Sequence, residues 1–388
     1  MGDDFTDITT EGFGSRLIGS FVGMLIGLVL LPLSVALLYW NEGRAVNAEQ
    51  ALAQGAKQVV EIDAGHLDSG ADGKLVYLSG PMTLTAAAKD PLFGVSGDNV
   101  IRLQRKVEMY QWKEEEQTSS HESVGGSKTT EKTYHYQQEW SSQPINSGAF
   151  KHSAGHQNPE MPIHSETFNS DNAKLGVYNL DSAVLDKLSD FQPFTPDQSP
   201  AATGDYRREG DGYFRGAGSP GAPEVGDVKV TFGAINAQPI SVVAGLSGDT
   251  LAAFHGAHNY VIVLAQAGTA SADELFMAKK RQEGKLSWIW RGVGCASMAI
   301  GFLLAARPAS MMLAFLPFLE GIAETGAFLI AIILTLPLAL LTIAVAWIAH
   351  RPALGIGLLV AAGALFWLLS RMRNTPQAAA GKPVRYAE

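Results

Sequence analysis

The stretch LIGSFVGMLIGLVLLPLSVALLYW, from Leu17 to Trp40, decides the fold. It is 24 residues long and contains no charged side chain. An α-helix needs about 20 apolar residues to cross the hydrocarbon core of a bilayer. The stretch is too long for the core of a signal peptide, and no small-residue cleavage motif follows it. We therefore predict an uncleaved membrane-spanning helix, and Pro32 is compatible with it because membrane helices tolerate proline.

Three further apolar runs follow near the other end of the chain. They cover residues 286–306, 325–349 and 353–370, and the last two are separated only by a tight turn at 350–352. Each is about long enough to cross a bilayer as a helix. The segment 307–324 between the second and third runs is apolar but holds two prolines and two glutamates, so we expect an interfacial or re-entrant piece. The sequence thus predicts an integral membrane protein with four transmembrane α-helices.

The polar part of the chain lies between the first and second runs. Residues 41–284 form one large extramembrane domain. A short polar N-terminal tail (1–16) precedes the first span, and a C-terminal tail (371–388) follows the last. Four crossings would place both tails on one side of the bilayer and the domain on the other. The basic residues that flank the spans are balanced, six on each face, so they do not indicate which side is cytoplasmic.

Alternating β-branched and aromatic residues predict that this domain is β-rich (α+β). A turn signal at 124–127 separates two arms, 107–116 and 132–140, which we expect to pair as a hairpin through aromatic cross-strand contacts. A capping box at Ser271 and Glu274 predicts a helix leading into the second span. Further strands are expected at 74–85, 100–112, 227–232, 240–244 and 260–266, short helices at 47–60 and 180–188, and loop throughout 193–224.

Composition excludes several classes of function. The 388 residues carry a net charge of −9, so no basic excess is available to neutralise phosphates, and nucleic acid is not an expected partner. The single cysteine, Cys295, excludes an intramolecular disulfide and any multi-cysteine metal site.

The candidate chemistry is sparse. The sequence contains no nucleophile elbow, no phosphate-binding loop and no His-Glu-x-x-His motif. Five histidines (His152, His156, His164, His255 and His258) are the best metal-ligand candidates, but hydrogen-bonded surface or turn histidines explain them better, because no acidic partner has ligand spacing. Glu320 and Glu324, four residues apart beside a span, suggest a cation or proton path, although a headgroup position explains them better. We therefore expect no catalytic residues, no metal and no cofactor.

Several strings, taken in order, resemble the transmembrane protein 43 (LUMA) family. They are YWNEGRAV ending at Val46, VEMYQW ending at Trp112, the group Trp140, INS (145–147) and Phe150, GHQNP ending at Pro159, and GDVKVTF beginning at Gly226. Arg351 and Pro352 also match in place. The residues that carry the resemblance most specifically are Asn41, Glu42, Gly43, Arg44, Tyr110, Trp112, Trp140, Asn146, His156, Asn158, Pro159, Gly226, Asp227, Arg351 and Pro352.

This resemblance implies a four-span protein whose large domain faces the lumen of the endoplasmic reticulum or the perinuclear space. In animal members it implies the inner nuclear membrane, association with lamins and emerin, and self-association, with no established enzymatic activity. The short loops and compact composition lead us to expect a bacterial member in the inner membrane, with its domain in the periplasm. The motif residues at the first membrane exit are expected to bond to one another or to the domain.

The leading hypothesis for function is a non-enzymatic membrane scaffold that contacts the lipid bilayer, self-associates and binds an unidentified protein partner through its extramembrane domain. Small residues in the second span (Gly292, Gly294, Ala296, Ala299 and Gly301) would allow close helix packing. A transporter or channel component is the alternative, and it requires polar residues that the third and fourth spans mostly lack. A histidine-ligated metal enzyme is the second alternative.

Overall fold

The computed structural model describes residues 4–122, 127–196, 202–313 and 320–352. The chain divides into two compact units. The first comprises residues 1–22, 47–286 and 307–325, and the second comprises residues 23–46, 287–306 and 326–388. Each is described separately below.

Two sheets make up most of the first unit. The larger, nine-stranded in its described part, has the order β1-β8-β7-β16-β15-β14-β13, with β9 also paired to β7 and β12 to β16. Its strands are β1 (Asp4–Glu11), β7 (Val100–Glu122), β8 (Lys128–Ser141), β9 (Glu166–Asn169), β12 (Gln192–Phe194), β13 (Ala202–Thr203), β14 (Tyr206–Glu209), β15 (Gly212–Arg215) and β16 (Val228–Asn236). The predicted β-rich domain is therefore present.

The second sheet has the order β2-β3-β17-β18-β11-β10-β4, with β21 paired to β17. Its strands are β2 (Val60–Glu61), β3 (Leu75–Gly80), β4 (Met82–Leu84), β10 (Ala173–Leu175), β11 (Tyr178–Leu180), β17 (Ile240–Ser247), β18 (Thr250–Ala252) and β21 (Leu264–Ala267). The remaining short elements are β5 (Lys89–Asp90), β6 (Val95–Ser96), β19 (Phe254–His255), β20 (Val261–Ile262), α2 (Ser182–Leu185) and 3-10 turns at Ser69–Ala71, Ser147–Ala149 and Ala257–Asn259.

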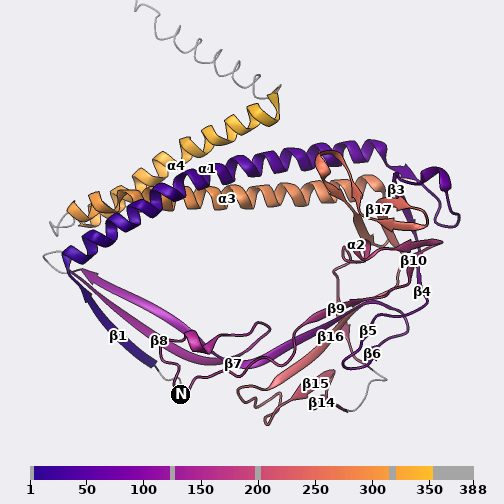
Figure 1. Cartoon of the computed structure of the whole chain (residues 1–388), viewed down its shortest axis with the longest axis horizontal. Coiled ribbons are helices and arrows are strands. Elements are labelled where there is room, and N and C mark those ends of the chain that lie inside the picture. Colours follow the sequence, from indigo (N-terminus) through magenta and orange to yellow (C-terminus); the bar gives the residue numbers. More distant parts are fainter. Residues whose placement is uncertain (1–3, 123–126, 197–201, 314–319, 353–388) are drawn as a thin grey trace, which may run out of the picture. The chain divides into compact units, whose positions relative to one another are not determined.

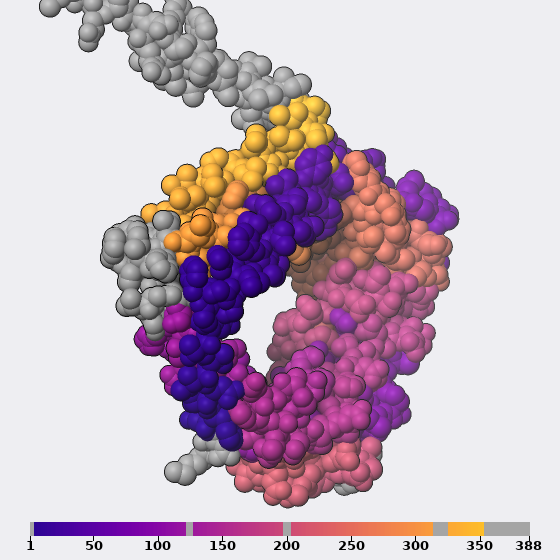
Figure 2. All heavy atoms as spheres, turned by 60° about the vertical axis from the view of Figure 1, so that its left-hand side comes forward, coloured from indigo at the N-terminus to yellow at the C-terminus, as the bar shows by residue number. Residues whose placement is uncertain are grey.

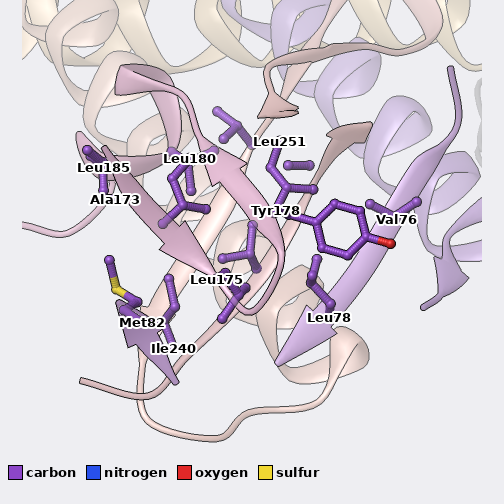
Figure 3. Packing of buried hydrophobic residues seen from close by; sticks show 14 of the residues in the cluster. Val76, Leu78, Met82, Ala173, Leu175, Tyr178, Leu180, Leu185, Ile240 and Leu251 are labelled. Atoms are coloured by element: carbon purple, nitrogen blue, oxygen red, sulfur yellow. The ribbon is translucent and has the colours of Figure 1, made fainter. Parts of the chain in front are cut away.

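Aliphatic side chains of the second sheet form its hydrophobic core. Figure 3 shows Leu78, Leu175 and Leu251 gathered around the ring of Tyr178. Tyr178 is fully buried, and its hydroxyl donates a hydrogen bond to the backbone oxygen of His66 (2.7 Å). The core is therefore apolar except where a tyrosine hydroxyl finds a backbone partner, as buried hydroxyl groups require.

The hairpin predicted around residues 124–127 is present as β7 and β8. Tyr110 pairs with Trp140, and their rings lie 5.3 Å apart between centroids. One aromatic cross-strand contact of the expected kind is therefore present, whereas Tyr134 and Tyr136 lie opposite Glu116 and Glu114. The hairpin is longer than predicted, because β7 continues to Glu122 and β8 begins at Lys128.

Two expectations for this unit need correction. The segment 193–224, expected to be loop, contains β13, β14 and β15, because its buried aromatic residues Tyr206, Tyr213 and Phe214 anchor short strands between glycine turns. Half of the segment 1–16, expected only to be a short polar tail, is the strand β1. It pairs antiparallel with β8 over eight residues, although its sequence DFTDITTE is polar and gave no clear strand signal.

The second unit consists of segments of three long helices. These are α1 (Phe13–Gln58), α3 (Ala272–Leu313) and α4 (Glu320–His350), the three helices in the described chain that are long and apolar enough to cross a membrane. The first three predicted spans are thus helical, and the fourth, 353–370, lies outside the described residues, as does the tail 371–388. Residues 307–313 and 320–324, part of the expected interfacial segment, continue α3 and begin α4.

The helix ends also agree with the sequence. The first span continues outward as a helix to Gln58. At the start of α3, the Ser271 Oγ accepts from the backbone N–H of Glu274 (3.3 Å), and the Glu274 carboxylate accepts from that of Ser271 (2.8 Å). The capping box is therefore formed, and its helix runs without interruption into the second span.

Close packing joins these helices in the second unit. Leu38 of α1, Met298 of α3 and Ala339 of α4 form one buried cluster, and the Ser34 hydroxyl donates to that of Ser297 (3.0 Å). In Figure 2 the atoms of α4 (yellow) lie along those of α1 (indigo). A Cβ placed on Gly27 would lie 2.6 Å from the backbone oxygen of Gly301, so the backbones of α1 and α3 approach closely there.

This contact generates a test of the helix packing. We expect Gly27→Ala to lower the stability of the detergent-solubilised protein by about 1–3 kcal/mol, because the new methyl group meets backbone atoms that cannot rotate away. Gly292→Ala is the matched control, since a Cβ there meets nothing within 4 Å. Thermal unfolding followed by tryptophan fluorescence would measure both, and equal melting temperatures for the two variants would contradict the packing described.

Candidate functional site

The carboxylate of Glu42 lies at the centre of a polar cluster within the second unit. Its side chain is 2% exposed, and Arg291 of α3 binds it through two atoms, Nε to Oε1 (2.6 Å) and Nη2 to Oε2 (2.8 Å). The indole Nε1 of Trp347, from α4, donates to Oε2 as well (2.7 Å). A buried carboxylate is tolerated only when it is paired and hydrogen-bonded. Glu42 therefore ties three helices together at one point, which we call the boundary cluster.

The residues beside Glu42 extend the boundary cluster. Asn41 is fully buried, and its side-chain amide lies within hydrogen-bond distance of both the backbone oxygen (3.2 Å) and the hydroxyl (3.3 Å) of Ser287. A Cβ on Gly43 would lie 2.8 Å from His350 Nε2, so only glycine leaves room for that imidazole ring. The ring of His350 also contacts Tyr39, with centroids 5.4 Å apart. Asn41 thus contacts α3, Glu42 contacts both α3 and α4, and Gly43 lies against the last residue of α4.

The sequence indicated one half of this cluster and missed the other. Asn41, Glu42 and Arg44 were expected to bond to one another or to the domain, whereas Asn41 binds α3 and Glu42 binds both α3 and α4. Arg291, near the start of the second span, is mostly buried and pairs with Glu42. The available signal was the spacing of Ser287 and Arg291, which places both on one face of α3.

The C-terminal end of α4 completes the cluster. Arg351 lies close enough to act electrostatically on Glu42, and its backbone N–H donates to the oxygen of Trp347 (2.7 Å). Pro352 is the second residue after His350, the last residue of α4, and Arg44 is half-buried on α1. The motif residues at the two ends of the matched strings, 41–44 and 351–352, therefore belong to the same unit.

A second group of motif residues fixes the base of the long hairpin in the first unit. The side chain of Asn158 accepts from the backbone N–H of Trp112 (2.7 Å) and donates to its carbonyl oxygen (2.9 Å). It also donates to the oxygen of Ile145 (3.3 Å). The amide therefore pairs with the edge of β7 as a neighbouring strand would. Asn146 has a local role, since its side chain caps the turn at Ser147–Ala149.

His156 and Tyr136 stack at this position, with centroids 4.0 Å apart and planes inclined by 17°. His156 is 2% exposed and also meets the edge of Trp112. The Tyr136 hydroxyl donates to the Glu114 carboxylate and accepts from the backbone N–H of His152. Burial, with a further contribution from the Glu114 carboxylate, raises the pKa of Tyr136 to about 12, so the phenol stays protonated as a donor. We call these stacked rings, with His152, the ring cluster.

The remaining motif residues hold a turn against β7. Tyr110 exchanges backbone hydrogen bonds with Gly226 and Asp227 (2.9 and 2.8 Å). Gly226 has φ +96°, and a Cβ there would meet Pro159 at 2.9 Å, so glycine is required on both grounds. The buried carboxylate of Asp227 accepts from the backbone N–H of Glu224 (2.8 Å). Trp140 packs beneath the ammonium group of Lys229, 4.5 Å from its ring centroid.

The histidines do not assemble as a metal site where their positions are known. No group of three or more His, Cys, Asp or Glu side chains is suitably placed for a metal ion among the described residues. His152 stacks on Phe5 and His255 contacts Asn259, while His258 contacts Gln50. These are ring and hydrogen-bond contacts of an ordinary structural kind.

The boundary cluster leads to a prediction about charge pairing. We expect Glu42→Gln to destabilise the protein by about 3–5 kcal/mol, because it leaves the Arg291 guanidinium buried without its counter-charge. Replacing both residues (Glu42→Leu with Arg291→Met) should recover most of this loss, since an apolar pair needs no counter-charge. Chemical unfolding in detergent would measure each variant.

The control for this prediction is Glu49→Gln on the same helix. Glu49 pairs with Lys280 at 3.6 Å and is partly exposed, so the change should cost less than about 1 kcal/mol. Equal losses for Glu42→Gln and Glu49→Gln, or a double variant as unstable as Glu42→Gln alone, would show that Glu42 is not a structural tie.

The hairpin base leads to a second prediction. Asn158→Asp should cost about 1–3 kcal/mol, because a carboxylate cannot donate to the carbonyl oxygens of Trp112 and Ile145 and leaves them unpaired. Asn172→Asp makes the same change at an exposed position and should be close to neutral. Thermal unfolding of both variants tests this, and a stable Asn158→Asp protein would argue against the strand-like role of the amide.

Comparisons with known proteins agree with these motifs. A family model described as transmembrane protein 43 matches residues 109–352. Human transmembrane protein 43 is 31% identical over 377 residues, covering 94% of this chain and 93% of the human protein. The rat protein is 31% identical over 88% of each chain, and the Drosophila melanogaster transmembrane protein 43 homolog is 32% identical over 87% of this chain and 91% of its own. No solved structure matches. The chain belongs to the transmembrane protein 43 family.

Proposed function

We propose that this membrane protein is a non-enzymatic scaffold. Its helices anchor it in the lipid bilayer, and its β-rich domain self-associates and binds a protein partner. We further propose that it is a bacterial inner-membrane protein whose domain faces the periplasm. The names of its relatives say only that they are transmembrane proteins, and the support for a scaffold role comes from this chain's own contacts.

The observation that supports the proposal is that the motif side chains bind other parts of the same chain. Catalysis needs polar groups that are free to meet a substrate in a cleft. Glu42 instead binds two other helices, Asn158 binds the edge of a strand, and the Asp227 carboxylate binds a turn. Residues of this kind preserve an architecture, which supports a function in assembly rather than in chemistry.

The long hairpin offers a surface for such assembly. Beyond Met109, β7 pairs with β8 alone along its described length, so residues 114–121 present an open strand edge. Their polar composition, with three consecutive glutamates beginning at Glu114, keeps the edge soluble and limits indiscriminate pairing. An exposed edge that is protected by charge favours a partner of matching chemistry over random association.

Photocrosslinking in native membranes would test the scaffold. We expect a photoreactive amino acid at Ser119, exposed on the hairpin, to capture the same few chains repeatedly, including a second copy of this protein. The control is the same reagent at Leu67, which is 61% exposed elsewhere in the first unit. If both positions capture only the same abundant neighbours, the scaffold proposal loses its support.

A further inference from the structure

The strand β1 is seated on the outer edge of β8. The two pair antiparallel from Asp4 opposite His135 to Glu11 opposite Lys128 (Figure 1). The hydroxyl groups of Thr6 and Thr133 lie 3.4 Å apart, and those of Thr10 and Thr129 lie 3.3 Å apart. Eight consecutive residues in one register define a specific docking geometry for an extended chain.

Charge complementarity accompanies this pairing. The Asp4 carboxylate lies 2.8 Å from His135 Nδ1. The Asp7 carboxylate lies 3.7 Å from both Lys151 Nζ and His152 Nε2. The β8 edge and the segment after it thus present basic groups to an acidic strand. Because opposite charges in register favour one partner over others, this pattern carries specificity.

An aromatic side chain fills the position between the two acidic residues. The ring of Phe5 stacks on His152, with centroids 4.6 Å apart and planes inclined by 20°. It also meets the edges of Tyr136 and His156 at 5.9 and 6.2 Å. The ring cluster therefore forms a seat for one aromatic residue of a strand added to β8.

The pairing of β1 with β8 cannot form if the apolar segment between the two strands crosses the bilayer once. The apolar stretch 17–40 follows β1 directly and precedes the domain that contains β8. If it crosses the bilayer once, β1 and β8 face opposite compartments. The polar hairpin cannot pass through lipid to meet β1, because an open sheet edge has no hydrogen-bond partners there. The chain therefore cannot combine the pairing of β1 with β8 and a single crossing of the bilayer by residues 17–40.

The exposed side chains of α1 favour crossing. Ile18, Leu25 and Val29 are 70%, 60% and 60% exposed, and most of the other large apolar residues of the stretch are similarly uncovered. Such a surface is stable in lipid and unfavourable in water. If residues 17–40 cross the bilayer once, β1 cannot reach β8, and the outer edge of β8 is then free in the membrane.

We infer that in the membrane the outer edge of β8 binds an extended acidic segment of a partner protein, which adds a strand to the sheet and places an aromatic residue on the ring cluster. Strand addition to an open edge is a common mode of peptide recognition. The occupant is not the β1 strand of a second copy, since that strand also precedes a membrane span. The inference rests on the proposed scaffold role and names the partner's chemistry.

Peptide binding to the full chain in lipid nanodiscs would test this. A fluorescent peptide with the sequence of residues 3–12 should bind, and the same peptide with Phe5→Ala or with Asp4 and Asp7 both changed to Lys should bind at least tenfold more weakly. In the protein, Lys151→Glu should weaken binding at least tenfold. Lys187→Glu, the same charge change at an exposed position elsewhere, should not.

A disulfide trap supplies the second measurement. In a Cys295→Ser background, Thr6→Cys with Thr133→Cys should remain unlinked in native membranes under mild oxidation. Disulfide formation there would show that the chain's own strand occupies the site, and it would overturn the inference. Absence of peptide binding would also overturn it, but would leave the crosslinking result from Ser119, and hence the scaffold proposal, unaffected.

Discussion

A buried carboxylate that must keep its partners is the constraint on which the helical part of this protein depends. Glu42 cannot be left alone in an apolar helix bundle, so Arg291 and Trp347 are held within 3 Å of it. Each partner comes from a different helix, and the geometry of one residue thus restricts the rotation and depth of three. Hydrophobic contacts such as those of Leu38 are less directional and could not alone define this arrangement.

The elements that the sequence predicted well are those determined by local pattern. The apolar stretch at 17–40, the capping box at Ser271 and the alternating aromatic residues of the hairpin each depend on spacing within a few residues. The strand β1 and the strands within 193–224 were missed because they depend on partners far away in the chain. Their sequences are polar or rich in glycine, and only pairing with β8 or β16 makes them strands.

The candidate sites show the same division. Motif strings singled out Glu42, Asn158 and Gly226, but they did not indicate what these residues contact. Trp347 belongs to none of these strings, yet it donates to a carboxylate 305 positions earlier in the chain. Contacts between residues so far apart in the chain leave no periodic pattern in a single sequence. The sequence therefore pointed to one residue of each contacting pair and not to its partner.

The two clusters show what the motif side chains of this chain contact. Substrate chemistry would require free functional groups, whereas these motif side chains are consumed by backbone and helix contacts. Gly43 leaves room for an imidazole ring, the amide of Asn158 pairs with β7 as a strand would, and burial raises the pKa of Tyr136. Each of these features maintains the fold. What remains available for interaction is the open edges of the hairpin, where backbone groups rather than reactive side chains would meet a partner. These contacts are consistent with the proposed role in assembly.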